Sequence, residues 1–215
     1  FQTKVMTSVY YHSSEKSGFD HRCTYTILGN GCIKVENDVK PFGELPILPK
    51  IGVQMTLRGE FSDFQWYGRG PHENYPDRKT GAAIGHYQSA ISKQYVPYVN
   101  PQENGNKEEV RWAAFLDSAG EGLMVVADDV LSVTALHYTA EDLAQAAHIH
   151  ELKPRRDVIV CLDARQLGLG NGSCGPGVLE KYRLYPQPVK FSFSFRPYSQ
   201  SAGDICFVAR LKMPI

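Results

Sequence analysis

Three loops hold most of the side chains in this sequence that could do chemistry. The first runs from Trp66 to Arg78, the second from Tyr95 to Gly105 and the third from Leu167 to Gly177. The first two combine carboxylates, amides and tyrosines with glycine and proline, and the third has five glycines in eleven residues. Long ordered loops of this kind often carry function. The plainer alternative is tight-turn chemistry, in which Asn and Asp side chains cap the backbone.

A pair of histidines, His148 and His150, is followed directly by Glu151. Such pairs occur in some metal and sugar-isomerising sites, but side chains two residues apart share a face only in an extended segment. No third ligand accompanies them, so we expect the imidazoles to bond loop carbonyls and carboxylates and expect no metal site. A mutarotase-type isomerase would instead use His148 or His150 as the acid and Glu103 as the base, with Arg111 in the same set.

The third loop does not match a phosphate-binding loop, despite its glycines. It lacks the Gly-Lys-Ser/Thr ending, and the sequence from Val178 onward resembles a strand rather than a helix,. Cys174 stands between Ser173 and Gly175. We expect it to be a small packing residue rather than a nucleophile, because no Cys-His motif accompanies it.

The overall composition excludes some classes of protein. The 215 residues include 23 Lys and Arg and 23 Asp and Glu, so the formal net charge is zero. That balance argues against a polybasic nucleic-acid or membrane binder. A hydrophobic content of 42% can supply a core,, and no apolar run approaches the roughly 20 residues of a membrane-spanning helix. The five cysteines have no metal-site spacing and predict free thiols, which leaves both the cytoplasm and the periplasm open as locations,.

The elements that must position the loops are mostly strands. Apolar and polar residues alternate from Val189 to Phe195, which predicts a strand with one buried aromatic face and one solvated face,. The Gly29-Asn30-Gly31 run between two strand-like segments predicts a hairpin. Helical signal is confined to Thr139–His148, where Thr139 and Asp142 stand at capping-box spacing,. We therefore expect an all-β sandwich with one or two short helices.

No internal repeat or linker-like stretch divides the chain, so we expect one β-sandwich domain over residues 1–198,. The composition changes after Pro197, and residues 199–215 form either a tail or an extra strand.

Three motifs in fixed order resemble the C-terminal domain of family 2 glycoside hydrolase β-galactosidases, of the small-chain or domain 5 type. They are Gly68-x-Gly-Pro-x-Glu-Asn-Tyr-Pro-Asp-Arg78, Tyr95-x-Pro-Tyr-Val-x-Pro-x-Glu-Asn-Gly105, and Gly168-Leu-Gly followed by Ser-Cys-Gly-Pro. The resemblance extends over roughly Pro46 to Pro197, and His148-Ile-His150 agrees with it.

The resemblance implies a galactose-mutarotase-like β-sandwich (supersandwich) that is the last domain of a larger hydrolase. In that family, retaining hydrolysis of terminal β-galactosides uses two glutamates on a separate barrel domain. The resemblance therefore implies no catalytic residue and no cofactor in this chain, which alone should be inactive. The magnesium and sodium ions of the parent enzyme would be bound by other domains. The implied partners are a galactoside substrate and those sibling domains, with no nucleic acid and no membrane.

The same resemblance implies functional roles for two of the loops. The third loop would border the sugar site through Asn171, Ser173 and Cys174, and Cys174 stands where the family has a stacking Trp. A thiol cannot supply an aromatic platform, so carry-over of substrate preference is not expected to be close. The first loop matches a mobile segment near the active site, with Gly68 and Gly70 as hinges. The residues of that segment are Gly68, Gly70, Glu73, Asn74, Tyr75 and Asp77.

Two alternatives to the accessory domain stay open at this point. One is a stand-alone mutarotase, which needs its histidines and a carboxylate in one cleft. The other is a carbohydrate-binding module, for which Trp66 and Trp112 are few and are expected in the core. The family's domain also has residues before the point matched by Phe1, so we expect an N-terminally incomplete domain with exposed strand edges or an exposed core face.

Overall fold

The computed structural model describes residues 1–172 and 174–213 of the chain. Its main elements are antiparallel strands, which join into one ten-stranded sheet. The strands are β1 (Gln2–Ser14), β2 (Ser17–Leu28), β3 (Ile33–Phe42), β4 (Lys50–Leu57), β5 (Asp63–Gly70), β6 (Ala83–Ala90), β7 (Lys107–Leu116), β8 (Glu121–Leu136), β9 (Val158–Gln166) and β10 (Val189–Ser199). The helices are α1 (Ala140–Gln145), α2 (Ile205–Arg210) and the 3-10 turns η1 (Ile91–Lys93), η2 (Ile149–Glu151), η3 (Glu180–Tyr182) and η4 (Gln200–Ala202).

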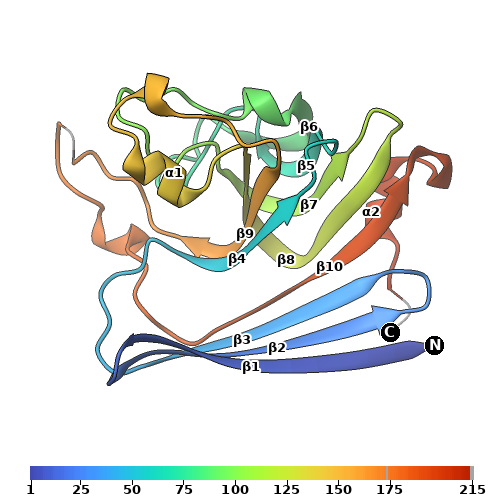
Figure 1. Cartoon of the computed structure of the whole chain (residues 1–215), viewed down its shortest axis with the longest axis horizontal. Helices are drawn as coiled ribbons and strands as arrows, with labels where there is room; N and C mark the ends of the chain where they lie inside the picture. The colour runs from blue at the N-terminus through green and yellow to red at the C-terminus, as the bar shows by residue number, and fades with distance from the viewer. Residues whose placement is uncertain (173, 214–215) are drawn as a thin grey trace.

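The sheet folds over on itself and forms two layers. Its main path is β1-β2-β3-β10-β8-β7-β5-β6, while β9 pairs with β8 and β4 pairs with β9. In Figure 1, β1, β2 and β3 form a lower layer, and β4 and β9 lie above it. The predicted all-β sandwich with short helices is therefore confirmed.

Strand β8 belongs to both layers. Residues 123–127 pair with β10, whereas residues 132–136 pair with β9. The neighbouring strand β7 shows register shifts near Val110, and Glu109 there has a φ of +54°. A bulge of this kind bends a strand and increases its twist, which lets β7 follow β8 from one layer to the other.

The main core lies between the layers. It includes Val35 of β3, Phe193 of β10, Phe64 and Trp66 of β5, and Leu162 of β9. Phe64 stacks on Trp66 with ring centroids 4.7 Å apart. Burial of such large aromatic surfaces is the main favourable contribution to folding here. The alternation of Val189 to Phe195 places the phenylalanines of β10 on this face, as predicted.

The predicted hairpin and capping box are both present. Leu28 N donates to Cys32 O at 2.9 Å, and Gly31 has a φ of +83°, which an L side chain rarely adopts,. The Thr139 hydroxyl accepts from Asp142 N at 3.1 Å, and Asp142 accepts from Thr139 N at 2.8 Å. The predicted helix length is wrong, because α1 ends at Gln145 and Ala146 has an extended conformation.

The described tail forms η4 and α2 and no strand. Helix α2 packs on the outer face of the sheet through Ile205 and Ala209, against Trp112, Met124 and Tyr198. The prediction that the outer face of β10 is solvated is therefore wrong in part, because Ser194 on that face is buried. No helix in the part of the chain that the structure describes is long and apolar enough to cross a membrane. All five cysteines are free thiols.

Candidate functional site

The three sequence motifs occupy the loops that connect β5 to β6, η1 to β7 and β9 to η3. In the structure the first loop consists of residues 71–82, since Trp66–Gly70 of the motif belongs to β5, while the second loop consists of residues 94–106 and the third of residues 167–179. The structure brings them together, because the first loop makes hydrogen bonds with both of the others.

Glu73 ties the first loop to the second. One carboxylate oxygen accepts from Gly105 N at 2.7 Å, and the other accepts from the Tyr98 hydroxyl. Burial, together with the bond to Glu73, raises the pKa of Tyr98 to about 12, so Tyr98 remains a donor near neutral pH. Hydrogen bonds to an ionised carboxylate are stronger than neutral ones, which makes Glu73 a firm link.

Asn74 continues this link in the interior. Asn74 N donates to Asn106 O at 2.8 Å, and Asn106 Nδ2 donates back to Asn74 O at 2.9 Å. The Asn74 side-chain oxygen accepts from Glu108 N at 2.8 Å. Both asparagines are fully buried, so each bond replaces one that water would otherwise make,.

A buried polar network extends from Asn106 across β7, β8 and β9. Glu108 accepts from Asn106 Nδ2 at 2.9 Å and from the Ser132 hydroxyl at 2.6 Å. Gln166 donates to Asn106 Oδ1 at 3.2 Å and to Asp163 Oδ2 at 2.8 Å. Every residue of this set is nearly inaccessible to water, so the network supports the loops from beneath.

Burial shifts the pKa values of charged groups beside the network. It raises the pKa of Asp163 to about 6, against the opposing effect of Lys50. Lys50 has the reverse balance: burial lowers its pKa, but Asp163, Cys161 and Glu103 together raise it above the ordinary value. Its Nζ lies 3.2 Å from Glu103 Oε2 and 3.5 Å from Cys161 Sγ. Glu103 therefore serves as the partner of a half-buried cation.

Lys107 is a second cation in the same region, and it is buried. Its Nζ donates to Gly105 O at 2.9 Å and lies 5.3 Å from the centroid of the Trp66 ring. Burial lowers its pKa to about 8. The carbonyl and the ring face stabilise the ammonium group and hold the end of the second loop.

Asp77 and Arg78 fix the first loop to the third. The Asp77 carboxylate accepts from Leu169 N at 3.0 Å and from Gly170 N at 2.8 Å. Arg78 donates to Asn171 Oδ1 at 2.9 Å and to Gly170 O. A Cβ at position 168 would lie 2.8 Å from the Asp77 carboxyl carbon, so glycine is required there for this close approach. We call these four contacts the Asp77–Arg78 clamp.

Two small hollows border the clamp and share Tyr182. One, of about 260 Å³, lies between the first loop and the third, and Asp77, Arg78 and Asn171 line it. The other, of about 290 Å³, is lined by Lys79, Glu108, Glu109 and Arg165 among others. Glu109 forms ion pairs of 3.0 Å with both Arg69 and Lys79. Burial raises its pKa, but these two cations outweigh burial and lower the pKa overall.

The glycines predicted as hinges have a packing role in the structure. Gly68 and Gly70 lie inside β5, opposite Gly85 and Ala83 of β6. A Cβ on Gly68 would come within 2.8 Å of Val110 Cα, and one on Gly70 within 2.7 Å of the Tyr87 ring. Tyr75 is also buried. The movement of this loop therefore stays a prediction. In the structure, hydrogen bonds to neighbouring segments hold the side chains of four of its residues, Glu73, Asn74, Asp77 and Arg78.

The residues predicted to contact substrate lie on the third loop. Asn171 is exposed; its N donates to Pro176 O and its O accepts from Cys174 N, both at 2.9 Å. Cys174 is exposed, so the prediction that it is a small packing residue is wrong. Ser173 lies outside the described residues. The segment predicted as a strand from Val178 contains η3 instead, and β10 begins only at Val189.

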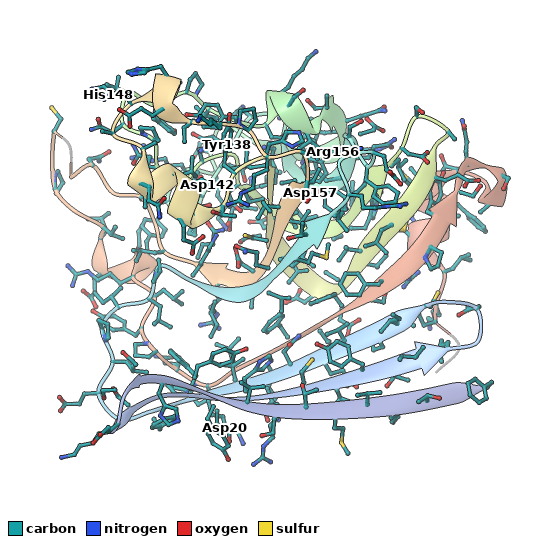
Figure 2. All side chains as sticks on the ribbon, viewed as in Figure 1. Asp20, Tyr138, Asp142, His148, Arg156 and Asp157 are labelled. Carbon is teal, nitrogen blue, oxygen red and sulfur yellow. The ribbon has the colours of Figure 1, made fainter. Side chains whose placement is uncertain are left out.

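Each of the alternative mutarotase residues has another partner in the structure. His148 lies on the segment after α1, at the edge of the molecule in Figure 2, and its Nδ1 is 3.3 Å from Glu151 Oε1. Its ring stacks on that of His150 with centroids 5.4 Å apart. Arg111 donates to the Glu109 carbonyl, while Glu103 pairs with Lys50. No hydrogen bond or ion pair within residues 1–172 and 174–213 joins these histidines to Glu103 or Arg111.

Six residues that support the loops were not predicted from the sequence. They are Lys50, Asn106, Lys107, Glu108, Asp163 and Gln166. The available signal was the dense polar run from Glu103 to Glu109, which leads into the apolar strand β7, because so many polar side chains beside apolar ones must find partners,. Asp163 and Gln166 gave no such signal, since they bracket the end of a strand far along the chain. Within the described residues there is no group of three or more His, Cys, Asp or Glu side chains arranged to hold a metal ion.

Comparisons with known proteins agree on one family. A family model described as β-galactosidase small chain matches residues 2–196. The chain is 37% identical over 147 residues to a β-galactosidase of Priestia megaterium, covering 68% of the chain and 14% of that protein. It is 39% identical over 173 residues to a β-galactosidase of Lactobacillus delbrueckii subsp. bulgaricus, covering 80% of the chain and 17% of that protein. The chain thus spans less than a fifth of the length of these relatives.

Proposed function

The chain belongs to the β-galactosidase small-chain family, and from this we propose that it is a non-catalytic domain of a retaining β-galactosidase. In that role it lends the third loop to the edge of a sugar site on a separate barrel domain, within an enzyme that hydrolyses terminal β-galactosides. The proposal includes a galactose-mutarotase-like form of the sandwich.

The Asp77–Arg78 clamp is the observation that carries the proposal. It holds residues 169–171 of the third loop, while Cys174 further along the loop is exposed. The first loop is in turn anchored to the buried network through Glu73 and Asn74. A rigid support with an exposed tip can reach a neighbouring domain without losing its shape.

The partners of the carboxylates support a non-catalytic role. Retaining hydrolysis needs two carboxyl groups about 5–5.5 Å apart, one of which must exchange a proton with the leaving group. Glu73 accepts from Gly105 and Tyr98, Glu108 accepts from Asn106 and Ser132, and Glu109 is paired with two cations. These carboxylates are engaged by the fold, so the two catalytic glutamates would come from the barrel domain.

Magnesium and sodium ions of such an enzyme would likewise be bound by its other domains. The galactoside and those domains are the proposed partners.

A chimeric enzyme tests the proposal. This chain replaces the matching 173-residue region of the Lactobacillus delbrueckii relative, and hydrolysis of o-nitrophenyl β-galactoside is measured. We expect activity in the chimera and none in the isolated chain. Cys174→Trp should lower KM, because an indole can stack on a sugar where a thiol cannot. Asp129→Asn, at an exposed position of strand β8, should leave KM unchanged. Hydrolysis by the isolated chain, or a KM insensitive to position 174, would contradict the proposal.

The two alternatives have their own tests. A mutarotase would accelerate the optical rotation change of α-galactose, which polarimetry on the isolated chain measures. His148 bonds Glu151, Glu103 pairs with Lys50 and Arg111 bonds the Glu109 carbonyl, and these other partners disfavour that result. A carbohydrate-binding module would need an exposed aromatic strip, but Trp66 and Trp112 are both buried.

A further inference from the structure

Helix α2 carries a cysteine that contacts a histidine on β6. Cys206 Sγ lies 3.7 Å from His86 Nδ1, which is a hydrogen-bond distance for sulfur. The family model matches residues 2–196, so α2 lies outside the matched region. A thiol beside an imidazole is a pairing that activates cysteine as a nucleophile, because the imidazole can take the thiol proton.

The hydrogen bonds behind His86 fix which of its ring nitrogens carries the proton. Asp63 Oδ2 accepts from Gln65 Nε2 at 3.0 Å, and the Gln65 oxygen lies 3.2 Å from His86 Nε2. A carbonyl oxygen can only accept a hydrogen bond, so Nε2 is the protonated nitrogen. In the neutral ring, Nδ1 is then free to accept from the Cys206 thiol.

Packing holds both members of this pair in place. The Trp112 ring lies against His86 with centroids 5.1 Å apart, and Trp112 is buried. Helix α2 is anchored to the same apolar cluster as Trp112 through Ile205 and Ala209. A nucleophile, a base and a group that orients the base are therefore held together on adjoining elements.

The Cys206 thiol remains protonated until a base acts on it. Burial and the charge of Asp204 raise the pKa of Cys206, and Arg210 opposes them by a smaller amount. The side chain is partly exposed, so it is not sealed from small reagents. Reaction at Cys206 therefore depends on transfer of its proton to His86 rather than on a thiolate that is already present.

A hollow beside this chain of hydrogen bonds indicates which reagents it would admit. Its volume is about 710 Å³, and it is lined by Asp63, Asp117 and Asp204, with no lysine or arginine among the described residues of its wall. Ile205, which directly precedes Cys206, also lines it. Three carboxylates without a cation favour a positively charged molecule.

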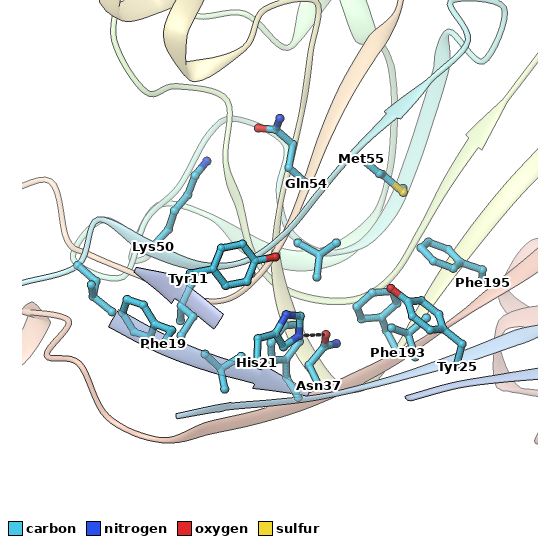
Figure 3. Close-up of a pocket in the computed structure, with 17 residues that line it drawn as sticks. Tyr11, Phe19, His21, Tyr25, Asn37, Lys50, Gln54, Met55, Phe193 and Phe195 are labelled. Carbon is cyan, nitrogen blue, oxygen red and sulfur yellow. Dashed lines mark hydrogen bonds between the residues drawn. The ribbon is translucent and has the colours of Figure 1, made fainter. Parts of the chain in front are cut away.

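The cavity between the two layers of the sandwich has a different character. It has a volume of about 590 Å³ and opens beneath β4. Figure 3 shows Tyr11, His21 and Tyr25 on the lower layer, with Lys50 and Met55 on the strand above. The described residues of its wall are mainly apolar and include no cysteine and no carboxylate. A cationic thiol reagent is therefore expected at the hollow beside α2.

We propose that Cys206 is a modification site that forms a mixed disulfide with a small cationic disulfide, with His86 as its base and Gln65 as a positioning residue. The Cys206 sulfur attacks one sulfur of the reagent while its proton passes to His86 Nδ1. A sulfur–sulfur bond forms to Cys206, the bond within the reagent breaks, and the departing thiolate takes the proton from the imidazolium. One disulfide is consumed and one thiol is released. This step is independent of the proposed galactosidase role.

Reaction of the chain with cystamine, a small disulfide that carries two amino groups, tests the proposal. The rate of mixed-disulfide formation at each cysteine is measured by acid quenching and peptide mass spectrometry, with the exposed Cys174 as the internal reference. We expect Cys206 to react about threefold faster than Cys174, or more, although it is less exposed. With oxidised glutathione, which is anionic, the ratio of the two rates should fall about threefold or more.

His86→Phe removes the base and keeps an aromatic ring against Trp112. It should slow the reaction of Cys206 about tenfold or more and leave that of Cys174 unchanged. If His86 only packed α2 against the sheet, its loss would expose Cys206 and speed the reaction. The direction of the change therefore separates the two roles.

Gln65→Leu and Gln88→Leu form a matched pair of variants. Both glutamines donate to Asp63, and of the two it is Gln65 that bonds His86. Gln65→Leu should slow the reaction of Cys206 about threefold, because the ring tautomer is no longer fixed, whereas Gln88→Leu should leave the rate within about twofold. Circular dichroism checks that both variants fold.

Three results would overturn the inference. One is a reaction of Cys206 with cystamine that is no faster than that of Cys174. Another is an unchanged or faster reaction of Cys206 in His86→Phe. The third is an equal effect of Gln65→Leu and Gln88→Leu, which would show that the bond from Gln65 to His86 has no part in the reaction.

Discussion

At the loop end of the molecule, polar groups are buried and bonded, and on the open side below β4, apolar groups are exposed. Asn74, Asn106 and Glu108 lie in the interior with partners for their side chains. On the open side, Val9 and Tyr11 stand beside a cavity. Both regions depart from the usual arrangement, in which polar groups lie on the surface and apolar groups lie in the interior.

The difference between the regions shows how each is completed. The loop end is complete within the chain, since hydrogen bonds among the three loops replace those to water. The open side keeps exposed apolar side chains and, among the described strands, an edge of β4 that no other strand pairs with,. Substitutions should therefore have large effects on the isolated chain at the loop end and small ones on the open side.

The largest effect is expected for Asn106→Leu. The change keeps a similar volume but leaves Asn74 O, Glu108 Oε1 and Gln166 Nε2 without this partner. We expect a loss of about 3–5 kcal/mol in the free energy of unfolding, measured with urea. The control is Met6→Leu on the exposed face of β1, which should change it by less than about 0.5 kcal/mol. Similar losses in both variants would remove the contrast between the regions.

The pH dependence of stability should show the cost of burying Asp163. Its folded-state pKa of about 6 lies above the ordinary value of 3.8, so the folded state binds more protons between these two pH values. The contribution of Asp163 to the free energy of unfolding is therefore most favourable below about pH 4. It falls by about 3 kcal/mol as the pH rises from 4 through 6. Urea unfolding between pH 4 and 7 measures it.

The controls for this pH effect are two amide variants. Asp163→Asn should abolish the dependence between pH 4 and 6, whereas Asp129→Asn, at an exposed position of strand β8, should retain it. If Asp163→Asn keeps the same slope, the carboxyl is not the titrating group.

A smaller effect is expected for Asp77→Asn in the clamp. The amide keeps one acceptor but loses the charge that strengthens the bonds from Leu169 N and Gly170 N,. We expect a loss of about 1–2 kcal/mol and faster amide exchange in the third loop. Thiol labelling of the exposed Cys174 should also change in rate, while Asp129→Asn leaves both measurements unaltered. An unchanged exchange rate would mean that the third loop is held by its own turns alone.

The smallest effect is expected for Val9→Thr on the open side. Valine and threonine have similar shape and strand propensity, and Val9 is 41% exposed. The free energy of unfolding of the isolated chain should change by less than about 0.5 kcal/mol. A decrease of more than about 1 kcal/mol in the free energy of unfolding would show that Val9 is packed in solution and that the open side is not exposed.

Local patterns predicted those features whose cause is local. The Gly29-Asn30-Gly31 turn needs a positive φ, the capping box needs two side chains three residues apart, and the phenylalanines of β10 need only alternation. The length of α1 was not predictable in this way, because its end depends on where Ala146 leaves the helix rather than on a breaker residue. The exposure of Cys174 likewise depends on how the clamp holds the third loop.

Residue order alone determined the strand alternation, the hairpin turn and the three motifs that resemble a β-galactosidase domain, because these depend on neighbours in the chain. The tertiary structure decided that Glu73 and Asp77 tie those motifs into one unit and that Glu103 serves Lys50 rather than a histidine. It also decided that the upper layer ends at β4 and leaves part of the lower layer exposed. Such pairings join segments up to about a hundred residues apart, and no local pattern specifies a partner at that distance.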